Sequence, residues 1–90
     1  MAARRTLALT EEQHLELEHY RDHAPRAYVR ERCAAVLKVA AGQAAHAVAR
    51  AGLLKPRDPD TVYGWLDAYQ AEGLAGLIAR PHGGYRRGRL

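Results

Sequence analysis

The chain has 90 residues, which is room for one small domain with a single core. Apolar residues make up 48% of it, with much alanine, no phenylalanine and few β-branched residues, so we expect an all-α fold. One cysteine excludes an intramolecular disulfide, and the apolar runs are too short for a membrane span or a secretory signal, so we expect a cytoplasmic protein.

The formal net charge of +4 is concentrated near the C-terminal end. Residues 1–72 contain ten basic and ten acidic side chains, whereas residues 73–90 contain no acid and four arginines: Arg80, Arg86, Arg87 and Arg89. A basic segment on a neutral domain suits a polyanion such as DNA. Arginine-rich termini also serve as solubilising or linker segments, so the charge alone leaves both interpretations open.

A first helix is predicted from Glu11 to Asp22. Thr10 can accept a hydrogen bond from the amide of Gln13, while the Gln13 side chain bonds back to the Thr10 amide. The few apolar residues of this helix indicate that it lies across the domain rather than at its centre: Leu15, Leu17 and Tyr20.

A second helix is predicted from Pro25, a residue suited to a first helical position, to Gly42. Its apolar residues recur at steps of three and four, which predicts one buried face: Val29, Cys33, Val36, Leu37 and Ala40. The alanine-rich stretch from Gln43 to Ala51 predicts a short third helix with Gly52 as its left-handed cap.

A fourth helix is predicted from Pro59 to Glu72, with Asp58 as its N-cap and Gly73 as its stop. One side should enter the core and carry the only tryptophan there: Val62, Trp65, Leu66 and Tyr69. The opposite side holds Asp60, Thr61, Tyr63, Gly64, Asp67 and Ala68. Further on, apolar residues can pack back on the domain: Leu74, Leu77 and Ile78.

These elements predict a bundle of about four to five short helices with a flexible basic tail. Residues 1–9 are expected to be a flexible N-terminus, residues 10–80 the folded domain, and residues 81–90 a basic Gly/Arg tail or linker. Two short helices joined by a glycine-containing turn are typical of the helix-turn-helix, whose second helix enters the DNA major groove. By spacing alone this indication is weak, because many small helical bundles share it.

Several segments together resemble the N-terminal, homeodomain-like helix-turn-helix of mariner-like insertion-sequence transposases: Arg32–Gly42, Ala47–Arg50, Thr61–Leu66 and Glu72–Pro81. The most specific parts are Thr-Val-Tyr-x-Trp-Leu and Glu-Gly-Leu-x-Gly-Leu-x-x-Arg-Pro. The resemblance implies that the helix carrying Thr61 and Trp65 is the recognition helix and that the tail leads to a second DNA-binding unit. The chain departs from the family in its longer, partly acidic turn, Leu53–Asp60. The resemblance also implies that the carboxylate-bearing catalytic domain of such transposases would come after Leu90, so we expect no transposition by these 90 residues alone.

On this interpretation four residues face the bases: Thr61, Tyr63, Gly64 and Asp67. The expected phosphate contacts are Gln43, Arg50, Lys55 and Arg57, together with Arg86, Arg87 and Arg89 of the tail.

We expect neither catalysis nor a cofactor, metal or small-molecule substrate. His19 and His23 lack a second ligand-bearing helix, the chain has no serine, and Cys33 has no identifiable base.

The expected partner is double-stranded DNA, with a second copy of the chain or a separate transposase catalytic subunit as further candidates. The chain would then be a transposase fragment or a stand-alone regulator of transcription, associated with the nucleoid. The alternative is a protein-interaction or oligomerisation module that no longer binds DNA. Three features favour that alternative: the neutral charge of residues 1–72, the acidic first helix, and the aspartates Asp58 and Asp60 beside the recognition helix.

Overall fold

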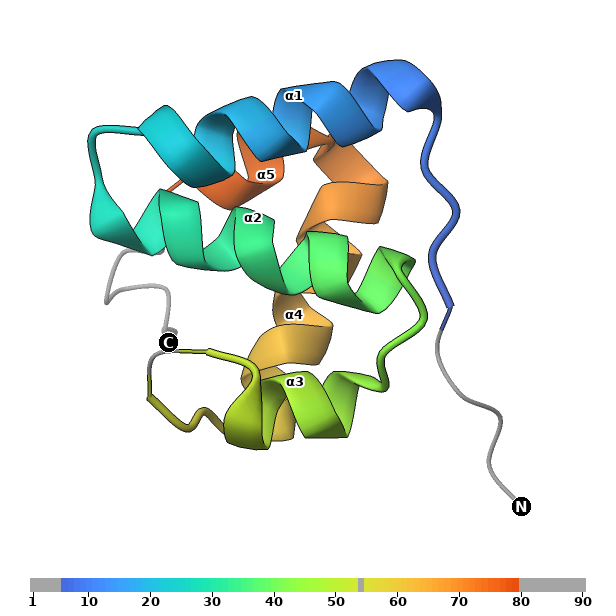
Figure 1. Cartoon of the computed structure of the whole chain (residues 1–90), viewed down its shortest axis with the longest axis vertical. Coiled ribbons are helices and arrows are strands. Elements are labelled where there is room, and N and C mark those ends of the chain that lie inside the picture. Colours follow the sequence, from blue (N-terminus) through green and yellow to red (C-terminus); the bar gives the residue numbers. More distant parts are fainter. Residues whose placement is uncertain (1–5, 54, 80–90) are drawn as a thin grey trace, which may run out of the picture.

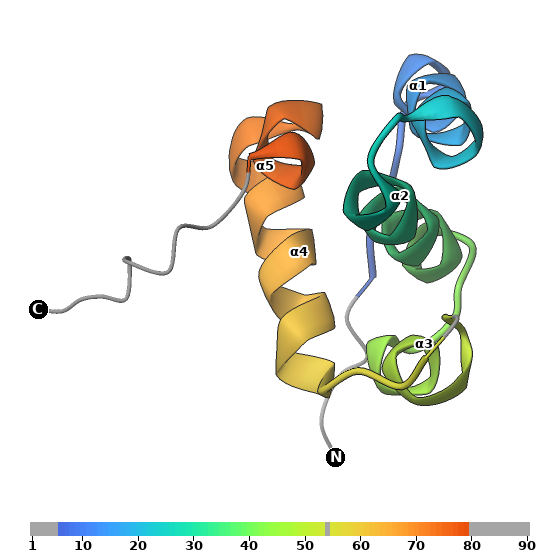
Figure 2. The same ribbon diagram turned by 90° about the vertical axis from the view of Figure 1, so that its left-hand side faces the viewer.

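The computed structural model describes residues 6–53 and 55–79, which form five helices and no strand. In chain order these are α1 (Glu11–His23), α2 (Ala27–Ala40), α3 (Ala45–Ala51), α4 (Pro59–Glu72) and α5 (Leu74–Ile78). In Figure 1, α1 and α2 lie side by side, and α4 passes behind α2 and α3. Figure 2 shows α4 as a rod that begins beside α3 and ends beside α5. The predicted all-α fold is confirmed.

The start of α1 forms as predicted. The amide of Gln13 donates to Thr10 Oγ1 at 3.1 Å, and the Thr10 amide donates to Gln13 Oε1 at 2.9 Å. These two bonds satisfy amides that have no partner within the helix. Leu17 is the buried residue of α1, whereas Leu15 is 57% exposed, so α1 covers the bundle through a narrow contact. Of the predicted flexible segment 1–9, the structure describes residues 6–9, where Leu7 and Leu9 are half-buried against the core.

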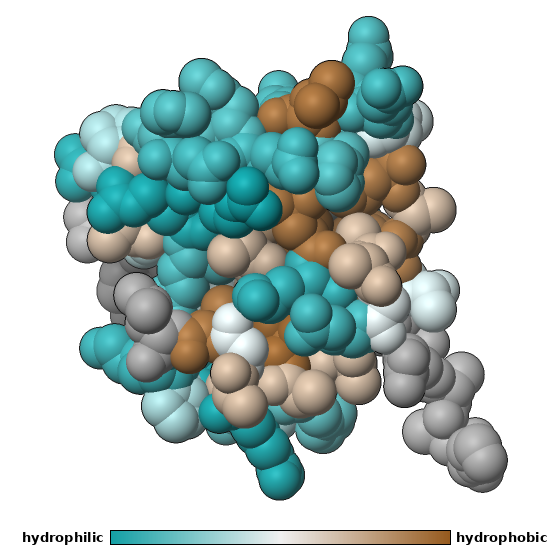
Figure 3. All heavy atoms as spheres, in the orientation of Figure 1, coloured by the Kyte–Doolittle hydropathy of each residue, from teal (hydrophilic) through white to brown (hydrophobic). Residues whose placement is uncertain are grey.

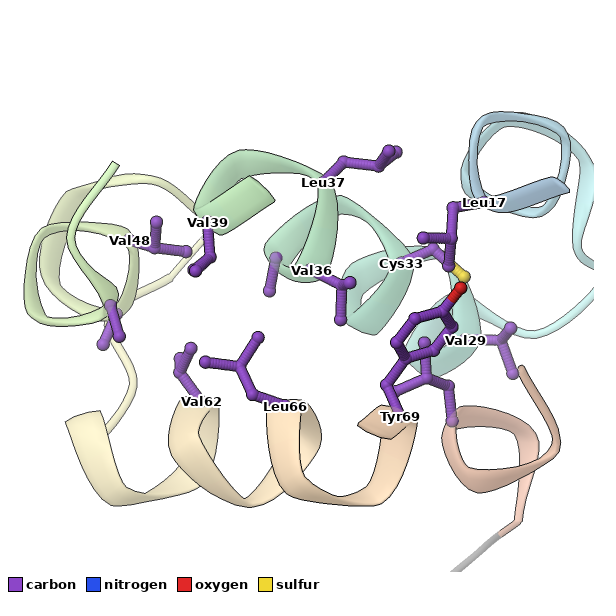
Figure 4. Packing of buried hydrophobic residues seen from close by; sticks show 14 of the residues in the cluster. Leu17, Val29, Cys33, Val36, Leu37, Val39, Val48, Val62, Leu66 and Tyr69 are labelled. Atoms are coloured by element: carbon purple, nitrogen blue, oxygen red, sulfur yellow. The ribbon is translucent and has the colours of Figure 1, made fainter. Parts of the chain in front are cut away.

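The predicted start of α2 at Pro25 is wrong by two residues. Arg26 has an extended backbone (φ −103°, ψ 133°) and is the N-cap, so Pro25 lies outside the helix. The first helical hydrogen bonds go to the Arg26 carbonyl, from the amides of Val29 and Arg30. Four of the five predicted stripe residues are buried, but Ala40 is only half-buried and Val39 is buried instead. Figure 4 shows Val39 pointing toward Val48 of α3, which explains the change.

Gly42, between α2 and α3, has a left-handed backbone conformation, whereas Gly52, which follows α3, does not. Gly42 has φ 108°, its amide donates to the Val39 carbonyl at 3.0 Å, and the Gln43 amide donates to the Lys38 carbonyl at 3.1 Å. This is the Schellman arrangement that closes a helix. It also keeps Gln43 outside α3, which begins two residues later than predicted. Gly52 has φ −91° and ψ −3°, so the prediction of a left-handed cap there is wrong.

Both predicted ends of α4 are confirmed. Asp58 Oδ1 accepts a hydrogen bond from the Asp60 amide at 2.8 Å, and Pro59 occupies the first helical position. Gly73 ends the helix with φ 69° and ψ −149°, a backbone conformation that is essentially restricted to glycine. The chain therefore turns sharply at Gly73 into α5.

Much of the core lies between α4 and the pair α2 and α3, and Leu17 of α1 and Leu77 of α5 belong to the same cluster. Figure 4 shows Val62, Leu66 and Tyr69 of α4 pointing toward Val36, Cys33 and their neighbours. The largest fully buried side chains are Leu17, Val36, Val39, Val48, Val62, Leu66, Leu77 and Cys33. Burial of this apolar area is the main driving force that fixes α4 on the bundle.

The prediction that Trp65 lies inside the core is wrong, because this residue is only half-buried and packs at the edge of the core. Its half-buried ring packs beside the guanidinium of Arg32, whose Cζ is 5.7 Å from the ring centroid. The same guanidinium donates to the carbonyls of Leu77 and Ala79 at 3.0 and 3.1 Å. Arg32 thus caps the C-terminal end of α5 while it covers Trp65. Leu77 is buried as expected, but Ile78 is 41% exposed.

Candidate nucleic-acid interface

The turn between α3 and α4 is held to both helices by backbone hydrogen bonds. The Arg57 amide donates to the Ala49 carbonyl of α3 at 2.7 Å. The Thr61 amide donates to the Asp58 carbonyl at 2.9 Å, which closes the first turn of α4. Although this turn is longer than in the family that the sequence resembles, these bonds fix where α4 begins.

The outer edge of α4 is open. Helical spacing places Asp60, Gly64, Asp67 and Ala71 on the side opposite the buried Val62, Leu66 and Tyr69, and all four are exposed. The neighbouring Thr61 is exposed as well. A Cβ atom built on Gly64 meets no heavy atom of the described residues within 4 Å, so packing within that part of the chain gives no reason for a glycine there. Glycine costs a helix about 1 kcal/mol relative to alanine.

Tyr63 lies at the junction of α3 and α4. Its half-buried ring packs against the core and meets the ring of the exposed His46 edge-on, with the centroids 5.8 Å apart. Of the four predicted base contacts, Thr61, Gly64 and Asp67 are therefore exposed, and Tyr63 is half-buried.

The predicted phosphate contacts fall into different environments. Arg50, on the last turn of α3, and Lys55, in the turn before α4, are both exposed. Gln43 is exposed too, but it lies in the turn before α3 and not on that helix. The tail residues that complete the set lie outside the described residues: Arg86, Arg87 and Arg89.

Arg57 is paired within the protein. Its Nε donates to Glu31 Oε2 at 2.8 Å, and its Nη2 donates to Glu31 Oε1 at 2.7 Å. Hydrogen bonding to this carboxylate raises the pKa of Arg57 further above its usual value. Sequence reasoning missed this pair because the two residues are 26 positions apart and on different elements.

The two aspartates at the start of α4 have different surroundings. The Asp58 carboxylate serves as the helix N-cap, so it is used by the fold. Asp60 is exposed in the first turn, where the positive end of the helix dipole favours a negative charge. Their presence therefore has a structural reason that is independent of any ligand.

The helix α1, on the side of the molecule away from α4, is rich in acidic residues. Figure 3, in the orientation of Figure 1, shows hydrophilic side chains over the outer face of α1. This helix contains five acidic residues and one arginine, and that arginine, Arg21, pairs with Asp22 at 2.9 Å.

The described part of the chain has neither a metal-holding cluster nor a membrane-spanning helix. Residues 6–53 and 55–79 contain no group of three or more His, Cys, Asp or Glu placed to hold a metal ion. None of the helices seen in those residues has the length and apolar character needed to cross a membrane.

Comparison with known proteins identifies one family. The model of the family described as "winged helix-turn helix" matches residues 32–90, a range that begins within α2 and includes α3, α4 and α5. The helix α1 lies before the matched range. No curated protein and no solved structure matches the chain.

Proposed function

Because this chain belongs to the winged helix-turn-helix family, we propose that it binds double-stranded DNA in a sequence-dependent way, with α4 in the major groove. The observation that carries this proposal is the open outer edge of α4, where Gly64 leaves room for a close approach. In a helix-turn-helix the recognition helix contacts base edges mainly through its N-terminal half. Thr61 and Gly64 occupy that half here.

The exposed edge of α4 would contact the bases with an acidic side chain, Asp67. A carboxylate can only accept hydrogen bonds, and the donors in the major groove are the amino groups of cytosine and adenine. Adenine also presents the acceptor N7, which would repel a carboxylate, so the aspartate at position 67 favours cytosine. We propose that the bound sequence contains cytosine beneath Asp67.

Phosphate contacts in this proposal come from segments that precede and follow α4 in the sequence. Arg50 and Lys55 are the exposed cations of α3 and of the turn. Arg86, Arg87 and Arg89 would add contacts from the tail, on the backbone or in a neighbouring minor groove. The chain would act as a binding module without catalysis of its own, derived from a transposase, as its sequence motifs suggest.

The test begins with selection of bound duplexes from a random pool, followed by affinity measurements across salt concentrations. Binding through phosphates should make log K fall linearly with log salt, by about 0.9 for each phosphate contact. Arg50→Gln should lower that slope by about one contact, and the triple substitution of Arg86, Arg87 and Arg89 by glutamine should lower it further. Arg21→Gln removes the same charge from α1 and is the matched control, which should leave the slope unchanged.

Two other outcomes would each contradict a stated part of this proposal. No retention of DNA at any salt concentration, together with a dimer in light scattering, would replace this proposal by the interaction module considered from the sequence. If the tail variant binds DNA with an unchanged dependence of log K on log salt, the tail makes no phosphate contacts. The proposed role of α4 would still stand.

A further inference from the structure

The ion pair between Glu31 and Arg57 connects α2 to the turn that leads into α4. Both guanidinium bonds are short, at 2.7 and 2.8 Å, and they form the two-pronged arrangement in which arginine holds a carboxylate most firmly. The Glu31 side chain is 18% exposed and the Arg57 side chain 35% exposed, so the pair lies at the surface but is partly covered.

The pair lies at the entrance of α4, where it can fix the orientation of that helix. Arg57 is two residues before Pro59, the first residue of α4, and its backbone amide is bonded to Ala49 of α3. One residue therefore ties the entrance of α4 to α3 through its backbone and to α2 through its side chain. With the Glu31 bond removed, Arg57 keeps its backbone bond to α3 but loses its side-chain bond to α2.

We propose that Glu31 is a positioning residue for DNA binding: through Arg57 it holds the first turn of α4 at the angle from which Thr61 and Gly64 meet the bases. This inference rests on the proposed function. It assigns to Arg57 a role inside the protein instead of a phosphate contact, and it makes an acidic residue favourable for binding a polyanion.

Simple electrostatics leads to the opposite expectation. Glu31→Gln removes one negative charge and releases a guanidinium close to the DNA, and both changes should tighten binding if Arg57 contacts phosphate. If the pair positions α4, the same substitution weakens binding to the selected duplex. A partly exposed pair of this kind corresponds to a loss of about three- to fivefold.

The experiment compares Glu31→Gln with Glu12→Gln in the full chain by fluorescence anisotropy on the selected duplex. Glu12 is exposed in the first turn of α1 and provides the same change of charge away from α4. We expect weaker binding for Glu31→Gln and unchanged or slightly tighter binding for Glu12→Gln. Equal or tighter binding by Glu31→Gln would overturn the inference, while binding by the parental chain would leave the proposed function standing. Failure of the parental chain itself to bind DNA would overturn both.

Arg57→Lys provides the second test, because it keeps the charge but cannot form the two-pronged bond. Positioning predicts the loss seen for Glu31→Gln with an unchanged salt slope, whereas a phosphate contact predicts retained affinity. The combination of Glu31→Gln with Arg57→Lys should bind no more weakly than either single variant, since both break one interaction. Hydrogen exchange without DNA gives a readout that does not depend on binding. The Arg57 and Thr61 amides should exchange faster in Glu31→Gln, and unchanged rates would overturn the inference.

Discussion

A methyl group added at Gly64 should have opposite effects on folding and on DNA binding. The substitution Gly64→Ala places a Cβ where none of the heavy atoms in residues 6–53 and 55–79 lies within 4 Å, so the described fold accommodates it without displacement. Alanine is preferred to glycine inside a helix by about 1 kcal/mol. We therefore expect the free energy of unfolding to rise by about 1 kcal/mol and the melting temperature by about 4–8 °C for a domain of this size.

The same methyl group would project from the edge of α4 that we propose to lie against the bases. Loss of close approach there should weaken binding to the selected duplex by about tenfold, which is the lower end of the range for one lost base contact. Thermal unfolding followed by circular dichroism measures the first effect, and fluorescence anisotropy with a labelled duplex measures the second. An unrelated duplex is the control, because phosphate contacts alone should be nearly unaffected. A variant that is more stable and binds the selected duplex as tightly as the parental chain would refute the placement of Gly64 against the bases.

Three further predictions concern the fold. Gly76→Ala should lower the free energy of unfolding by about 1–3 kcal/mol, because its Cβ would lie 2.4 Å from the Ala68 carbonyl oxygen; a melting temperature at or above the parental value would contradict this packing. Burial raises the pKa of Cys33 from 9.0 to about 11, so the thiolate fraction near pH 8 should be about a hundredfold lower than in the unfolded chain. A thiol reagent should therefore label the native protein slowly and the urea-unfolded protein rapidly. Because the Cys33 thiol of the unfolded chain ionises at a lower pH than that of the folded protein, denaturant titrations should also show the free energy of unfolding falling as the pH rises from about 9 to 11. Arg32→Met should remove the bonds to α5 and lower the free energy of unfolding by about 1–3 kcal/mol, which urea titration measures. If the amides of α5 exchange hydrogen at the same rates in this variant as in the parental protein, Arg32 does not cap α5.

The elements that the sequence predicted best are those whose cause lies within a few residues. Thr10 with Gln13, and Asp58 with Pro59, specify helix starts through hydrogen bonds that span two or three positions. Gly73 specifies a stop because its backbone conformation excludes other residues. The buried face of α4 followed from helical periodicity, apart from Trp65.

The errors arose where local chemistry allowed two outcomes and packing decided between them. Pro25 can be a first helical residue, but the extended Arg26 places it before α2. Gly42 and Gly52 both follow alanine-rich helices, and only the hydrogen bonds made by the chain after Gly42 select it as the left-handed residue. The pairing of Arg57 with Glu31 depends on two elements being folded against each other, and no local pattern encodes that meeting.

The fold also changes the meaning of the charge balance in residues 1–72. Ten acids and ten bases over that range suggested a surface without attraction for DNA. Five of those acids, however, belong to α1, which packs against α2 and presents a hydrophilic outer face on the side away from α4 (Figure 3). Residues 24–72 carry seven bases and five acids, and Arg50 and Lys55 are exposed next to α4. A neutral sum therefore hides a separation of charge between two sides. In the complex that we propose, such a separation would orient the approaching protein with α1 turned outward and α4 toward the DNA.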